Sequence, residues 1–170
     1  MEITLATKEH ISEIMDIIND CKYRLKKTGV NQWQDGYPNE AVFSLDCEKN
    51  ECYICVENQK ICGVFVLSFL PEPSYTNIYE GSWGGEFYGV LHRVAVHNDY
   101  LGTGLASNII EYAKSKCLQL CEQKEEMWLR VDTHEDNKAM QRLLEKNQFT
   151  YCGIIYLEDG SKRLAYNYKV

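Results

Sequence analysis

The chain has 170 residues, of which 45% are hydrophobic and 25% charged, enough for one compact domain with a hydrophobic core. Acidic side chains outnumber basic ones by 25 to 18, which gives a net charge of −7. The basic face that nucleic-acid-binding proteins usually carry is not visible, so we expect no nucleic-acid partner. An acidic surface suits a cationic substrate such as an amine, although it also serves solubility.

The sequence carries no sign of a membrane protein. The longest apolar run, residues 61–70, is too short to span a bilayer and contains Gly63 and Ser68. The first residues resemble a short strand rather than a signal peptide. We therefore expect a cytoplasmic protein without a membrane partner.

Apolar periodicity predicts alternating strands and helices. Thr7 can cap a first helix with an apolar stripe through Ile14 and Ile18, and Pro38 suits the first turn of a second helix. In chain order, the predicted elements are a strand over 2–6, a helix over 7–28, a helix over 38–48, strands over 51–57, 60–70 and 87–96, a helix from 105, a strand over 127–132, a helix capped by Asp136, and strands over 149–156 and 162–170.

The order of these elements predicts the fold class. Hairpins at 58–59 and 159–160 give antiparallel pairs, whereas the strand–helix–strand unit at 87–132 requires a parallel, right-handed crossover. We expect an α/β fold, a central mixed sheet flanked by helices, built as a single domain over 1–170. The segment 71–86 lacks periodicity and is rich in aromatic residues, as in functional or disordered loops.

Eight cysteines raise the question of metal or redox chemistry. Cys52 and Cys55 form a C-x-x-C, but residues three apart on a strand face opposite sides and cannot easily share a metal. Cys117 and Cys121 have the spacing of packing residues on a helix. We expect reduced cysteines that pack as small hydrophobic side chains, and no metal site.

The strongest local pattern is a strand, a turn with two glycines and the start of a helix, in the segment Val94-Ala95-Val96-His97-Asn98-Asp99-Tyr100-Leu101-Gly102-Thr103-Gly104-Leu105-Ala106. Glycines let backbone amides approach a ligand, and a helix N-terminus offers unpaired N–H groups, so the pattern suits phosphate. A Walker loop is excluded because Leu105 stands where lysine is required, and a dinucleotide fingerprint because Ser107 replaces its third glycine. A coenzyme A pyrophosphate loop competes with glycines that serve only a tight turn and close helix packing.

This segment resembles motif A of the GNAT superfamily of N-acetyltransferases, whose loop reads Q/R-x-x-G-x-G/A. Gly104 and Ala106 match its last two positions, and Leu101 departs from its first. Residues 137–149 resemble motif B, N-x-x-A-x-x-L-Y-x-x-x-G-F. There, Asn137, Leu143 and Phe149 match, whereas Met140, Leu144 and Gln148 stand in place of Ala, Tyr and Gly.

The resemblance implies the GNAT fold and acetyl-CoA as co-substrate. The pantetheine arm would pair with the backbone of Val94, Ala95 and Val96, and the pyrophosphate would take loop amides, at Leu101, Gly102, Thr103, Gly104, Leu105 and Ala106. Asn137 would contact the cofactor, although it equally suits a simple helix start. The implied reaction is direct acetyl transfer to a primary amine of a small molecule or peptide, without a covalent enzyme intermediate.

Candidate catalytic and substrate residues flank this segment. His92 and Glu86 are the candidate bases, with His134 less favoured, and a packed or surface role is an equal alternative for His92. On a regular strand His92 shares a face with Val94 and Val96 and Arg93 points away, free to anchor a loop, unless a bulge intervenes. The family's tyrosine acid is replaced by Leu144. Four aromatic residues are candidates for an acceptor pocket: Trp33, Tyr37, Tyr79 and Trp83. Core packing is an equal alternative for Trp33.

A second hypothesis keeps the fold without turnover, as a coenzyme A-binding regulatory or structural module. Tight cofactor binding without any acceptor would favour that hypothesis, and absence of binding would return the glycines to a plain turn. The C-terminal strand is one that a homodimer could pair or exchange.

Overall fold

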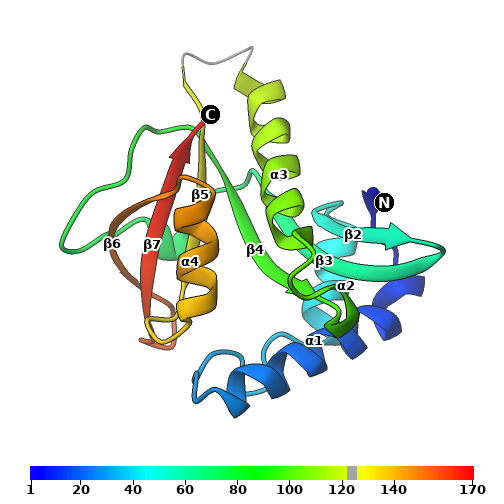
Figure 1. Ribbon diagram of the computed structural model, residues 1–170. Coiled ribbons are helices and arrows are strands. Elements are labelled where there is room, and N and C mark those ends of the chain that lie inside the picture. Colours follow the sequence, from blue (N-terminus) through cyan, green and yellow to red (C-terminus); the bar gives the residue numbers. More distant parts are fainter. Residues whose placement is uncertain (122–125) are drawn as a thin grey trace. The chain divides into compact units, whose positions relative to one another are not determined.

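The computed structural model describes residues 1–121 and 126–170. Figure 1 shows its elements, which in chain order are β1 (Glu2–Leu5), α1 (Ile11–Lys27), α2 (Glu40–Glu48), β2 (Cys52–Glu57), β3 (Lys60–Ser68), β4 (Tyr88–Val96), α3 (Leu105–Cys121), β5 (Trp128–Thr133), α4 (Lys138–Lys146), β6 (Thr150–Tyr156) and β7 (Lys162–Lys169). Short 3₁₀ turns lie at Lys8–His10, Pro73–Tyr75 and Asn98–Tyr100.

In residues 1–121 and 126–170, seven strands form one mixed sheet in the order β1-β2-β3-β4-β5-β7-β6. β4 and β5 are parallel, whereas the pairs β1–β2, β2–β3, β5–β7 and β6–β7 are antiparallel. The helix α3 connects the two parallel strands, as a crossover requires. The predicted α/β fold with a mixed sheet is therefore confirmed.

The chain forms two compact units. The first contains Met1–Leu67 and His92–Ile109, and the second contains Ser68–Leu91 and Ile110–Val170. β4 and α3 contribute residues to both. The expected single domain over 1–170 stays a prediction.

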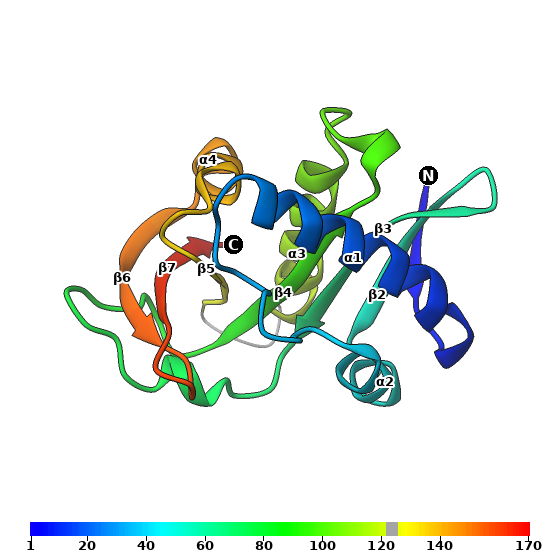
Figure 2. The same ribbon diagram turned by 90° about the horizontal axis from the view of Figure 1, so that it is seen from below.

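In the first unit, α1 and α2 bury their apolar faces on the same core as β2, β3 and the end of β4. Figure 2 shows the two helices of this unit. The stripe predicted for α1 is buried as expected, with Ile14 and Ile18 fully inaccessible. The core consists of Ala6, Ile14, Ile17, Ile18, Phe43, Cys47, Cys52, Ile54, Val64, Val66 and Ala95. Burial of these side chains fixes the position of β4 within the unit.

In the second unit, the segment 71–87 packs on a cluster formed by Tyr75, Val90, Ile155 and Ala165. The hydroxyl of Tyr75 donates to Asp132 Oδ2 at 2.8 Å. Further along, Tyr79 exchanges both backbone hydrogen bonds with Ile154 of β6, each 2.8 Å long. These contacts tie the long segment down against the sheet, although its sequence has no periodicity.

In the described residues, three helices begin later than predicted. α1 begins at Ile11 rather than directly after Thr7, because Thr7 precedes the 3₁₀ turn Lys8–His10. For the other two, a residue other than the expected one caps the helix. α2 begins at Glu40 rather than at Pro38, since the side chain of Asn39 accepts from Val42 N at 3.1 Å. α4 is capped by Asn137 rather than Asp136, since Asn137 Oδ1 accepts from Met140 N at 3.1 Å. Within 1–121 and 126–170, no helix is long and apolar enough to cross a membrane.

Candidate functional site

The loop between β4 and α3 requires its two glycines for their backbone conformation. Gly102 has φ 76° and Gly104 has φ 91°, in the left-handed region that side chains disfavour. A Cβ atom at either glycine would meet no atom within 4 Å. The two glycines are therefore needed for the backbone conformation of the turn and not for close packing against the helix.

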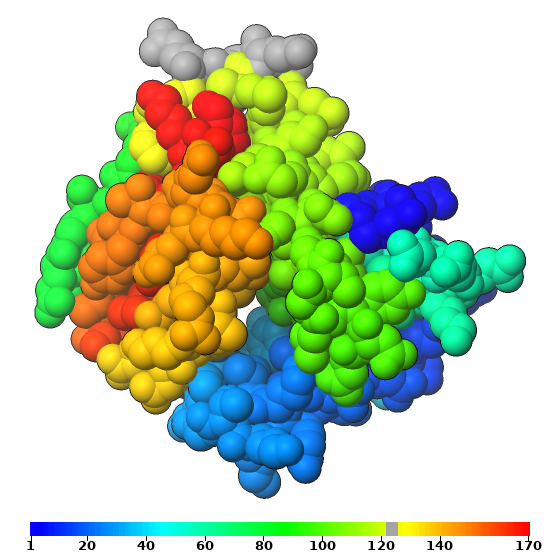
Figure 3. Space-filling model, in the orientation of Figure 1, coloured from blue at the N-terminus to red at the C-terminus, as the bar shows by residue number. Residues whose placement is uncertain are grey.

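The same turn leaves a row of backbone donors without protein acceptors. Within the described chain, the N–H groups of Gly102, Gly104, Leu105 and Ala106 have no carbonyl partner, while Gly104 O accepts from Asn108 N at 3.1 Å and begins the helix. Residues 101–104 are exposed, and this green segment lies on the surface in Figure 3. The dipole of α3 adds positive potential here, so unpaired donors and electrostatics both favour an anion at this loop.

Polar contacts from α1 anchor the start of this loop within the first unit. Arg24 Nη2 donates to the carbonyl of Val96 at 3.0 Å, and Arg24 Nη1 donates to Asn98 Oδ1. Asn98 Nδ2 in turn donates to Asp20 Oδ2 at 2.7 Å. This anchor was missed by sequence reasoning, because its partners are more than 70 residues apart in the chain.

Along its edge facing β5, β4 is paired over only a few residues. The parallel register with β5 joins Tyr88–Val90 to Trp128–Arg130, and in the described chain it includes no later β4 residue. Val94, Ala95 and Val96 follow in the first unit, where His97 N donates to Cys62 O of β3 at 2.9 Å. The three residues expected to pair with a cofactor thus lie beyond the register with β5.

The regular alternation of β4 is broken at Arg93, whose φ is 51°. His92, Arg93 and Val94 are all half-buried, between the buried Leu91 and Ala95. Strand alternation, which predicted that His92 and Val94 share one face of the sheet, therefore does not apply across Arg93. Arg93 anchors neighbouring segments, as a sequence argument allowed.

Arg93 reaches two partners within the first unit. Its Nη1 lies 3.3 Å from Asp46 Oδ2 on α2, and the two side chains are only 16% and 8% exposed. Its guanidinium carbon lies 5.5 Å from the centroid of the Tyr37 ring. Burial raises the pKa of the Asp46 carboxyl, and the charge of Arg93 opposes that rise. Asp46 could have been noticed in the sequence as an acidic residue on the apolar face of its helix.

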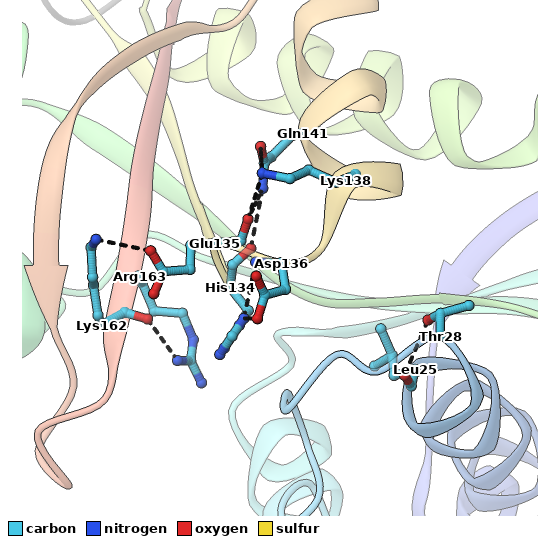
Figure 4. A network of polar contacts seen from close by, with 9 residues as sticks. All are labelled: Leu25, Thr28, His134, Glu135, Asp136, Lys138, Gln141, Lys162 and Arg163. Atoms are coloured by element: carbon cyan, nitrogen blue, oxygen red, sulfur yellow. Dashed lines mark hydrogen bonds and ion pairs between the residues drawn. The ribbon is translucent and has the colours of Figure 1, made fainter.

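The other candidate bases lie in the second unit. Glu86 is exposed in the loop before β4. His134 Nδ1 accepts from Asp136 N at 3.1 Å, inside a polar network that joins the β5–α4 connection to β7 (Figure 4). There, Lys138 Nζ donates to the carbonyl of Glu135 at 2.8 Å and Lys162 Nζ pairs with its carboxylate at 2.9 Å. The structure thus brings only His92, of the three, into the unit that holds the glycine loop.

The four aromatic pocket candidates divide between the units. Trp33 packs against the core of the first unit, and Tyr37 is 39% exposed over Arg93. In the second unit, Tyr79 packs edge-on to Tyr156. Trp83 donates from Nε1 to Tyr75 O at 3.0 Å, and the guanidinium of Arg130 lies 4.5 Å from its ring centroid. Trp83 thus has a packing role of its own in the second unit.

Two further observations bear on other kinds of site. A hollow of about 410 Å³ lies in the second unit, lined by Glu80, Gly81, Ser82, Trp128, Thr150, Tyr151, Cys152 and Asn167, and it includes none of the predicted site residues. Within the described chain, no cluster of three or more His, Cys, Asp or Glu side chains is arranged to hold a metal ion.

Comparison with known proteins identifies the family. The family model described as acetyltransferase (GNAT) family matches residues 11–149. The chain belongs to the GNAT acetyltransferase family. Motif A of the GNAT family thus coincides with the exposed glycine loop and the start of α3, and motif B with α4.

Individual relatives agree with this assignment. A GNAT-family acetyltransferase from Streptococcus agalactiae is 33% identical, with a TM-score of 0.83 over 98% of this chain and 93% of its own. A GNAT-family structure from Listeria monocytogenes, 20% identical with a TM-score of 0.72, shares the fold and covers 99% and 94% of the two chains. A Bacillus subtilis protein, the uncharacterized N-acetyltransferase YesJ, is 24% identical over 132 residues, 76% of this chain and 70% of its own.

Proposed function

We propose that the protein transfers the acetyl group of acetyl-CoA directly to a primary amine of a small molecule or peptide. The observation that carries the proposal is the row of unpartnered amides at Gly102, Gly104, Leu105 and Ala106, on a loop whose glycines are open to solvent. Family membership supports a coenzyme A pyrophosphate as the anion. The residues present fit this group, because backbone donors need no particular side chain at Leu101.

The first unit contains the groups that such a reaction needs for binding. Loop amides hold the pyrophosphate, and the backbone of Val94, Ala95 and Val96 offers hydrogen bonds to the extended pantetheine. Asn137, in the second unit, stays a candidate contact of the cofactor, and its side-chain oxygen also caps α4 by accepting from Met140 N.

Acetyl-CoA supplies a thioester whose carbonyl carbon accepts the amine. In the transfer, a C–N bond forms, the C–S bond breaks, and one proton leaves the amine nitrogen. Backbone N–H groups of β4 stabilise the charge that develops on the carbonyl oxygen. His92 is the candidate base, because it lies on the same strand and an imidazole nitrogen can accept a proton from the amine. Thiolate needs an acid less than an alkoxide does, which suits a chain with Leu144, fully buried, in the tyrosine position.

Amine-dependent release of free coenzyme A thiol tests the proposal. The purified protein is incubated with acetyl-CoA and a panel of small amines, amino acids and peptides, and products are identified by mass. We expect at least one amine to gain one acetyl group while the protein alone stays unlabelled by radioactive acetyl-CoA. A stable acetyl label on the denatured protein would contradict direct transfer. Tight acetyl-CoA binding with no acceptor in the panel would favour a non-catalytic module.

A further inference from the structure

The left-handed residue in the middle of β4 needs something to hold it. Arg93 has φ 51° without being glycine, and a long side chain disfavours this conformation unless its surroundings enforce it. It lies directly before Val94, Ala95 and Val96, the residues that the proposed function places against the cofactor. The conformation of Arg93 therefore sets the direction of the peptide groups that follow it.

The enforcing contact comes from α2. Asp46 is 5% exposed, on a helix whose other buried residues are Phe43 and Cys47. Its Oδ2 atom lies 3.3 Å from Arg93 Nη1. A buried carboxylate without its cation is strongly disfavoured, so the charge pair ties β4 at Arg93 to α2. The core on which α2 packs includes Ala95, two residues further along β4, so the helix is itself fixed relative to the strand.

The loop before α2 closes on the same side chain. The Tyr37 ring lies 5.5 Å from the guanidinium carbon of Arg93. Arg93 thus contacts a helix and a loop that come much earlier in the chain, and its side chain cannot swing away without losing both contacts. A glycine at this position would adopt the same φ freely but would make neither contact.

We propose that Asp46 is a positioning residue, which through its ion pair with Arg93 holds the left-handed turn of β4 and so aims the peptide N–H groups that polarise the thioester carbonyl. The inference rests on the proposed function, because it concerns the geometry of that same cofactor site. Asp46 acts through Arg93 and touches no reacting atom.

Isotope-edited infrared spectroscopy of acetyl-CoA with a labelled carbonyl measures this polarisation without any acceptor amine. We expect wild-type protein to lower the carbonyl stretching frequency on binding, and Asp46→Asn to lose most of that shift. Asp46→Asn should also weaken acetyl-CoA about tenfold relative to free coenzyme A, because only the acetylated form presents the carbonyl. The matched control is Glu48→Gln on the same helix, which removes an exposed ion pair with Lys8 and should change neither quantity.

A second pair of variants keeps the inference testable if Asp46→Asn does not fold. Arg93→Gly adopts the left-handed φ without strain and should keep more of the carbonyl shift than Arg93→Ala, which loses the ion pair and keeps the strain. A wild-type carbonyl band in folded Asp46→Asn, or equal bands in the two Arg93 variants, would overturn the inference alone. Failure of wild-type protein to bind either acetyl-CoA or coenzyme A would overturn the proposed function and this inference together.

Discussion

Replacement of Gln148 by glycine should stabilise the protein, because the structure places Gln148 where a helix ends in the left-handed conformation. Gln148 has φ 66° and directly follows the C-cap Asn147 of α4. Gln148 N donates to Glu145 O at 2.9 Å and Phe149 N donates to Leu144 O at 3.0 Å. This is the Schellman arrangement, in which glycine is the usual residue, and it explains why motif B has glycine at this position.

The size of the effect follows from two opposing terms. Glycine avoids the strain of about 1–2 kcal/mol that the left-handed conformation imposes on a residue with a side chain. Its greater freedom in the unfolded chain destabilises the folded variant by about 0.5–1 kcal/mol. The Gln148 side chain is exposed, so its removal leaves packing unchanged. The expected net gain is about 0.5–1 kcal/mol in the free energy of unfolding, or about 1–4 °C in Tm.

Urea unfolding of wild type and variant measures this gain. The matched control is Gln119→Gly, the same substitution at an exposed position inside α3, which should lose about 1 kcal/mol because glycine weakens helix interiors. The two variants should therefore shift the unfolding midpoint in opposite directions. A loss of stability in Gln148→Gly similar to that in Gln119→Gly would refute the reasoning.

Two further predictions concern the thiols and the loop anchor. Burial raises the pKa of Cys55, Cys117 and Cys152 to about 12, from an ordinary 9.0. The stability that these protonated thiols contribute is therefore complete below pH 9 and is lost as pH rises toward 12. For the fully buried Cys117 the loss is about 1.4 kcal/mol at pH 10. Between pH 8 and pH 10, urea unfolding should show that Cys117→Ala loses less unfolding free energy than wild type does, by about that amount. An equal loss in the two proteins would contradict the burial of this thiol. Arg24→Ala should weaken coenzyme A binding about three- to tenfold, because it releases the start of the glycine loop. Lys26→Ala, which changes an exposed neighbour on α1, should leave the affinity unchanged. Equal affinities of the two variants in calorimetry would exclude the anchor.

Much of the fold was accessible to sequence reasoning because local patterns and packing agree. The stripe of α1, the two-residue turn at Asn58 and Gln59 and the crossover through α3 are short-range signals that the core of each unit reinforces. Helix starts were less predictable. The choice between Asp136 and Asn137 as the cap of α4 depends on which side chain reaches the first amides, and both residue types are good caps.

The part of the candidate site that consists of backbone amides could be predicted from the sequence. The glycine spacing predicted an anion loop, and the structure adds that close packing does not explain Gly102 or Gly104. Arg24, Asp46 and Arg93 acquire their roles only through contacts distant in the chain. No periodicity reports such contacts, and the left-handed turn at Arg93 overrides the strand parity on which placement of His92 would otherwise depend.

We propose that the loop amides of the first unit bind the pyrophosphate of acetyl-CoA. Titration calorimetry of wild type, Gly104→Asp and Gly160→Asp with acetyl-CoA is the decisive test of this binding. Both glycines have positive φ and open space at Cβ, so the two substitutions impose similar strain. Only the carboxylate at 104 lies beside the loop amides, where it repels phosphate and competes for the same donors. We predict saturable binding by wild type and Gly160→Asp, and affinity lower by about 30-fold or more, roughly 2 kcal/mol, in a folded Gly104→Asp. Equal binding by all three proteins, or none by wild type, would contradict the account.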